Sequence, residues 1–124
     1  MARKFPDEWY EQAAVIEWIE RQHPWLINHT IYIMADTKCS LYVGNMLNKM
    51  GRRKGRSDLF FAYPTTKFRG LFIEMKTATG RLSKEQKEFL ERMNMFGYYA
   101  TAAYGTEEAI AIIKGYLSDT LLTK

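Results

Sequence analysis

Residues 58–76, with the sequence DLFFAYPTTKFRGLFIEMK, decide the fold. Two apolar runs, at residues 58–62 and 70–76, flank a turn-like segment, 63–69, that contains Pro64. Apolar and aromatic runs on either side of such a segment predict the two strands of a hairpin. In a hairpin closed by this turn, paired residue numbers sum to about 133, which places Asp58 opposite about residue 75. We therefore expect Asp58 to lie beside Glu74 and Lys76.

Two charged residues interrupt the second apolar run. Since successive strand residues alternate between faces, Glu74 and Lys76 share a face with Phe72. Burial of an unpaired charge costs several kcal/mol, so these side chains must pair with each other, reach a solvent cleft or hold a metal. A structural Glu–Lys pair at a strand end is the simplest alternative. With Asp58 nearby, however, two carboxylates would converge, and such a pair suits Mg²⁺, which prefers oxygen ligands.

The rest of the chain alternates between helical and strand patterns. Apolar spacing and capping residues predict helices at residues 7–22, 38–50, 83–95 and 106–117, and strands at residues 30–34 and 98–104. Asp7 is the expected N-cap of the first helix, and Gly51 is expected to end the second. The order α-β-α-β-β-α-β-α predicts an α/β fold with a mixed sheet flanked by helices. Without repeats or linker-like stretches, residues 1–124 are expected to form one domain, with its core at about residues 7–117.

Glu8 and Gln86 each have a structural and a functional interpretation. Glu8 lies on the inward stripe of the first helix, between Val15 and Ile19 in projection. An acid in the first turn favours the positive end of the helix, but it is also placed to be a third carboxylate at the hairpin. Similarly, Ser83 and Gln86 have the spacing of a capping box, which accounts for both residues without any function.

Basic residues gather before and around the hairpin. The chain has 18 Lys and Arg against 14 Asp and Glu, a net charge of +4. Between residues 37 and 73, however, eight basic residues accompany one acid, Asp58. Such a block indicates a polyanionic partner, although a solvated surface gives the same pattern. The expected DNA-binding residues lie in the loop before Asp58 and just beyond the second strand: Arg52, Arg53, Lys54, Arg56, Arg81, Lys84 and Lys87.

Composition excludes several other classes of protein. Apolar residues make up 47% of the chain, which is enough for a packed core, and no apolar run has the length of a transmembrane helix. The first residues do not form the pattern of a secretory leader. One cysteine, Cys39, allows no disulfide within the chain and favours a reducing compartment. His23 and His29 are not spaced as part of a zinc ligand set.

Residues 51–86, GRRKGRSDLFFAYPTTKFRGLFIEMKTATGRLSKEQ, resemble the VRR-NUC (virus-type replication-repair nuclease) domain of the PD-(D/E)XK nuclease superfamily. The resemblance spans about residues 7–117. Two departures from the family pattern are Ser57, where the family has proline, and Ala35-Asp36, where it often has asparagine. The residues that match are Gly51 and Gly55 before Asp58, then Glu74-Met75-Lys76, Gly80-Arg81, Ser83 with Gln86, and, upstream, Glu8 with Gln12.

The resemblance implies a metal-dependent DNA endonuclease that uses Mg²⁺ or Mn²⁺. Asp58, Glu74 and the Met75 carbonyl would hold the metal, and Glu8 would complete the site; helical geometry favours Glu8 over Glu11. Lys76, expected to stay protonated beside two carboxylates, would orient the attacking water or stabilise developing charge. Gln86 would position water or phosphate.

The resemblance also implies a stand-alone, phage-type member of the family. Such a protein would be a homodimer that acts on four-way (Holliday) junctions or other branched DNA in the cytoplasm of a bacterial host. Two other interpretations remain open. One is a non-catalytic nucleic-acid-binding domain that keeps the nuclease fold, and the other is a structural protein whose buried acids form only ion pairs.

Overall fold

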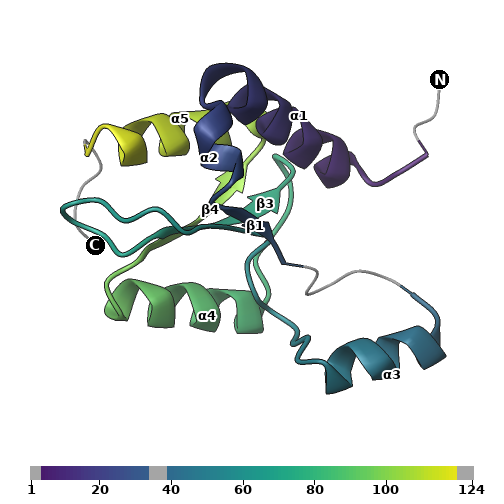
Figure 1. The fold of residues 1–124 in the computed structure, drawn as a ribbon. Helices are drawn as coiled ribbons and strands as arrows, with labels where there is room; N and C mark the ends of the chain where they lie inside the picture. The colour runs from purple at the N-terminus through teal and green to yellow at the C-terminus, as the bar shows by residue number, and fades with distance from the viewer. Residues whose placement is uncertain (1–3, 34–38, 120–124) are drawn as a thin grey trace.

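A computed structural model describes residues 4–33 and 39–119. It confirms the α/β fold: a four-stranded mixed sheet is flanked by helices, with α1, α2 and α5 on one face and α4 on the other (Figure 1). None of the described helices is long and apolar enough to cross a membrane. The elements are α1 (Asp7–Gln22), α2 (Pro24–Ile27), β1 (Thr30–Tyr32), α3 (Leu41–Lys49), β2 (Leu59–Phe61), β3 (Leu71–Lys76), α4 (Lys84–Met95), β4 (Tyr99–Tyr104) and α5 (Thr106–Leu117).

The sheet has the order β1-β2-β3-β4, with β2 antiparallel to β1 and β3, and β4 parallel to β3. The predicted hairpin forms, and its register lies within one residue of the approximate sum of 133. Leu59 pairs with Ile73, so paired numbers sum to 132. The turn itself fits a sum of 133, since the Thr65 N–H donates to the Phe68 carbonyl. One residue between the turn and the paired strands therefore has no partner. Extending the pairing by one residue beyond Leu59 places Asp58 opposite Glu74.

Each face of the sheet has its own apolar core. On the α1 side, strand residues such as Ile73 and Leu59 pack with Val15 and Ile19, all of them fully buried. On the α4 side, Phe72 packs against residues of α4 and β4. The alternation of strand side chains puts Glu74 on the same face as Phe72, as expected, and so directs it towards α4. The buried residues of this second core are Phe72, Phe89, Leu90 and Ala100.

Helix ends differ from the predictions in three places. Pro6 is the N-cap of α1, so the prediction of Asp7 as N-cap was wrong; Asp7 begins the helix and favours its positive end. A short helix that was not predicted, α2, begins at Pro24, because proline fits the first turn of a helix. The second predicted helix begins later than expected, at Leu41, where the Ser40 hydroxyl accepts from the Val43 N–H.

Helix α3 stands apart from the layered body of the protein (Figure 1). Gly44 is its one buried residue. Its large apolar side chains are left in solvent, with Leu41 82%, Tyr42 83% and Met50 74% exposed. An amphipathic helix normally buries its apolar stripe against the rest of the fold. In this chain α3 therefore forms an arm whose apolar side is uncovered.

Candidate active site

Asp58 and Glu74 form a carboxyl pair on the α4 side of the sheet. Glu74 is 3% exposed, and the Met75 N–H donates to Asp58 Oδ2 at 2.7 Å. Burial raises the pKa of the Asp58 carboxyl above its usual value, and the negative charge of Glu8 acts in the same direction. Hydrogen bonds with the Glu74 carboxyl and the Met75 N–H oppose this shift, as does the charge of Lys76. The structure thus places the two carboxyl groups close enough to influence each other's protonation, in a largely desolvated setting.

Glu74 is held by two neighbours. The Gln86 Nε2 donates to Glu74 Oε2 at 3.1 Å, and Lys76 Nζ lies 3.7 Å from the same oxygen. The Glu74–Lys76 ion pair that the sequence left open as a structural alternative is therefore present. It lies beside Asp58, so the ion pair and the carboxyl pair belong to one cluster, which also includes Gln86.

Gln86 is fixed at both ends of its amide. Its Oε1 accepts from the Ser83 N–H at 2.8 Å, while the Ser83 Oγ accepts from the Gln86 N–H at 3.1 Å. These bonds are the predicted capping box, which is confirmed. The cap directs the Gln86 Nε2 at Glu74, and the expected contact of Gln86 with water or phosphate stays a prediction. In this arrangement Gln86 positions a carboxylate.

Glu8, which helical geometry favours as the site residue, and Glu11 have different surroundings. Glu8 is partly buried and close enough to Asp58 to affect its pKa. The Glu11 carboxylate instead accepts from the backbone N–H of Thr106 and, at 2.9 Å, from the Thr106 hydroxyl. Thr106 is the first residue of α5, so Glu11 caps that helix across the fold. Of the two acids, Glu8 is therefore the one near the carboxyl pair.

The donors at this cluster suit a hard divalent cation. Two carboxyl groups this close, one buried and one half-buried, either share a proton or ionise together around a positive charge. The Lys76 carbonyl accepts from the Gly105 N–H on the β4 side of β3. Because successive carbonyl groups of a strand point to opposite neighbours, the Met75 carbonyl points towards β2 and Asp58. Within residues 4–33 and 39–119, no three His, Cys, Asp or Glu side chains are grouped closely enough to hold a metal by themselves. The fit of this cluster to a divalent cation thus rests on the two carboxylates and the Met75 carbonyl.

The basic loop before Asp58 is anchored at both ends. Arg52 and Arg53 donate back to the α3 arm, with Arg52 Nε at 3.1 Å from Asn48 Oδ1 and Arg53 Nη1 at 2.8 Å from the Asn48 carbonyl. Further along, Gly55 has φ +86° and packs on Glu85 at the start of α4. A Cβ at position 55 would lie 2.5 Å from the Glu85 Cβ. The loop therefore contacts the α3 arm at one end and α4 at the other. Asp58 of the carboxyl pair follows it in the sequence.

Apart from Arg56, the remaining predicted DNA-binding residues lie around the start of α4. A hydrogen bond from the Glu85 backbone N–H lowers the pKa of the Glu85 carboxyl, and the positive charge of Lys54 lowers it further. Lys54 therefore lies near the start of α4. Arg56 Nη1 is buried without a hydrogen-bond partner in the described part of the chain. Lys84 is 85% exposed and lies 4.0 Å from Glu88. Arg81 and Lys87 line a pocket with Tyr104.

Tyr104 is a neighbour of the cluster that sequence reasoning did not single out. It ends β4 and is the register partner of Lys76, so it lies one strand away from the cluster. Its only signal in the sequence is an aromatic residue at a strand end, which is too common to single out.

The departure from the family pattern at Ala35-Asp36 lies outside the described residues. Ser57, at the other departure, is 1% exposed.

Comparisons with known proteins agree on one family. The sequence profile of the VRR-NUC domain matches residues 6–107. Among solved structures, the fold matches a "VRR_NUC domain protein" with a TM-score of 0.77 and 26% sequence identity, over 94% of this chain and 92% of that chain. A search of curated proteins found no match.

The packing of Gly55 predicts a difference between two glycines with positive φ. Gly51→Ala, at φ +111° with open space around it, should lose about 1–2 kcal/mol to backbone strain. Gly55→Ala should lose about 1–3 kcal/mol more, because its Cβ also collides with Glu85. Chemical denaturation of the two variants measures the difference. Equal losses would contradict the close approach of the loop to α4.

The contacts of Glu11 predict that it stabilises the fold. Glu11→Ala should lower the free energy of unfolding by about 1–2 kcal/mol, because α5 loses its cap. Glu17→Ala, whose carboxylate is exposed and pairs with Arg21, is the matched control and should change stability by less than about 0.5 kcal/mol. Thermal or chemical unfolding compares them. A Glu11→Ala variant as stable as the control would show that the cap contributes nothing.

Proposed function

The chain belongs to the VRR-NUC family of nuclease-type domains, and from this premise we propose that it is a Mg²⁺- or Mn²⁺-dependent endonuclease that hydrolyses phosphodiester bonds in DNA. The observation that carries the proposal is the pairing of the half-buried Asp58 carboxyl with the buried Glu74 carboxyl, with Lys76 beside them. Two carboxylates are costly to bury together, and a divalent cation offsets that cost while serving the reaction. A purely structural ion pair would need one carboxylate, so the second supports a metal site.

We assign the roles in the reaction from the contacts. Asp58, Glu74 and the Met75 carbonyl would hold the metal, and Glu8 would complete the site directly or through water. A metal bound there would supply Lewis-acid stabilisation and a more acidic water. Lys76 would orient the attacking water and balance negative charge on the phosphate. Gln86 holds Glu74 in place from α4 and is a positioning residue.

We further propose that the substrate is branched DNA, such as a four-way junction, and that the protein acts on it as a homodimer. The basic loop and the cations around α4 flank the carboxyl pair, so DNA backbone on either side of the cut would meet positive charge. The uncovered apolar side of the α3 arm supports the dimer. Contiguous exposed apolar surface of this kind marks protein interfaces, and two-fold homodimers are the commonest assembly.

Cleavage of a panel of labelled DNAs tests the proposed activity. Single strands, duplex, flaps and a four-way junction are incubated with Mg²⁺, Mn²⁺ or EDTA. Cutting should require the metal. Glu74→Gln should reduce the rate more than about a hundredfold, because residues that merely orient metal ligands already contribute 10–100-fold. Gln86→Ala should fall in that smaller range, and Lys114→Ala on α5 should cut normally.

A binding measurement separates the metal site from the activity. Mn²⁺ should raise the thermal midpoint of the wild-type protein, because a ligand that binds only the folded state stabilises it. Asp58→Asn should abolish that rise. DNA binding without cutting, together with no response to Mn²⁺, would instead identify a non-catalytic member that keeps the fold.

The dimer prediction has a matched pair of methionines. Met50, 74% exposed at the end of α3, and Met95, 80% exposed at the end of α4, occupy similar positions on different helices. Met50→Lys should weaken dimerisation at least about tenfold, since a charge would be buried in the apolar contact. Met95→Lys should leave it unchanged. Sedimentation velocity over a concentration series measures both, and a wild-type monomer at all concentrations would reject the dimer.

A further inference from the structure

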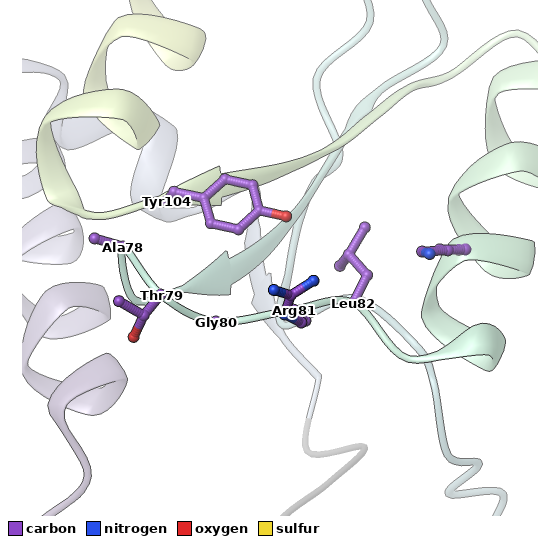
Figure 2. A pocket seen from close by; sticks show the side chains of 7 residues that line it. Ala78, Thr79, Gly80, Arg81, Leu82 and Tyr104 are labelled. Carbon is purple, nitrogen blue, oxygen red and sulfur yellow. The ribbon is translucent and has the colours of Figure 1, made fainter.

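A pocket adjoins the carboxyl cluster on the β4 side. It encloses about 540 Å³ between the loop after β3, α4 and the end of β4. Figure 2 shows the Tyr104 ring extending over the loop, with Gly80, Arg81 and Leu82 along the same wall. A second hollow of about 420 Å³ shares Leu82, Lys87 and Tyr104 with the first. Pockets that hold small ligands are typically about 300–1,000 Å³, so the space suits one nucleotide unit.

The lining has the chemistry of a nucleotide site. Tyr104 is 38% exposed, so a face of its ring is available for stacking. In the described ranges, neither Arg81 nor Lys87 has an ion-pair partner among the acids, so both charges are available to a phosphate. The acids Glu91 and Glu108 line the second hollow and not the first. Their negative charge repels an anion, so a phosphate would favour the first hollow. Aromatic rings combined with cations are the recurrent means of binding single-stranded nucleic acid.

The position of the pocket connects it to the reaction. Gly80 packs on the Lys76 stem: a Cβ at Gly80 would be 3.3 Å from both Cβ and Cδ of Lys76. Tyr104 pairs with Lys76 across β3 and β4. A DNA strand whose phosphate meets Lys76 therefore has its neighbouring nucleotide at this pocket. In an intact duplex that base is stacked and paired, and only an unpaired base can lay its face on Tyr104.

We propose that this pocket binds one unpaired nucleotide of the DNA strand being cut, with its base stacked on Tyr104 and its phosphate held by Arg81 and Lys87. The inference rests on the proposed function for its substrate and adds a requirement to it. The preferred DNA would have a single-stranded segment next to the scissile bond. A single-stranded flap supplies such a segment directly, whereas a fully paired four-way junction would have to unpair a base at its branch point to supply one.

Fluorescence anisotropy in EDTA tests the pocket without any cleavage. The probes are labelled oligo(dT), a duplex of equal length, and an abasic strand. Tyr104→Ala should weaken binding to oligo(dT) about tenfold, the lower part of the range for loss of one base–aromatic stack, and should leave duplex and abasic DNA unaffected. Tyr104→Phe should bind like wild type, because stacking needs the ring and not the hydroxyl. Arg81→Ala should weaken oligo(dT) binding and lower its salt dependence by about one phosphate contact.

Tyr63→Ala is the matched control, since Tyr63 is similarly exposed, at 36%, but follows β2 at the far end of the sheet. Unchanged oligo(dT) binding by Tyr104→Ala, or equal losses on duplex and single strand, would overturn the proposal. So would tight binding of thymidine 5′-monophosphate in preference to the oligonucleotide. Tyr104-dependent binding in a protein that cuts no DNA would support the pocket while rejecting the nuclease, so the two failures are distinguishable.

Discussion

Glu74 is an ionisable side chain in a strand that is buried on both faces, and the surrounding structure compensates for its burial. An isolated buried carboxylate would cost several kcal/mol. Here a lysine two residues along the same strand faces it, and an amide from α4 donates to it. That amide is held in turn by the cap of α4, so the start of the helix, the register of the hairpin and the position of the charge depend on one another. Moving any one of them would leave the carboxylate without its partners.

The local parts of this arrangement could be predicted from the sequence. Asp58, Glu74 and Lys76 lie on one hairpin, and the capping box lies within four residues, so alternation and short-range spacing suffice to place them. The observed register differs by one residue from the approximate expectation, because the turn keeps its expected pairing while an unmatched residue precedes the ladder. Such an irregularity depends on how the two strands twist against their neighbours, which the residues of the turn do not encode.

The parts that sequence reasoning missed depend on contacts between distant segments. Glu11 and Thr106 meet only because α1 and α5 cover the same face of the sheet. Tyr104 reaches the cluster because β4 crosses over to lie parallel to β3. The α3 arm has an ordinary amphipathic pattern, and the same pattern would describe a helix packed on the body. In each case the sequence specifies the element, whereas the partner is decided by tertiary packing.

The contiguity of residues 58–86 has a consequence for the order in which the protein assembles. These residues supply the carboxyl pair, the lysine and the glutamine, and the loops between them are short, so bringing them together costs little chain entropy. Contacts of this kind tend to form early in folding, before long-range ones. Glu8 belongs to α1, which lies far earlier in the sequence, so it approaches the cluster only once α1 has docked on the sheet. The proposed cation site would therefore be half-built in a partly folded chain and completed only when α1 docks, which ties its completion to that of the fold.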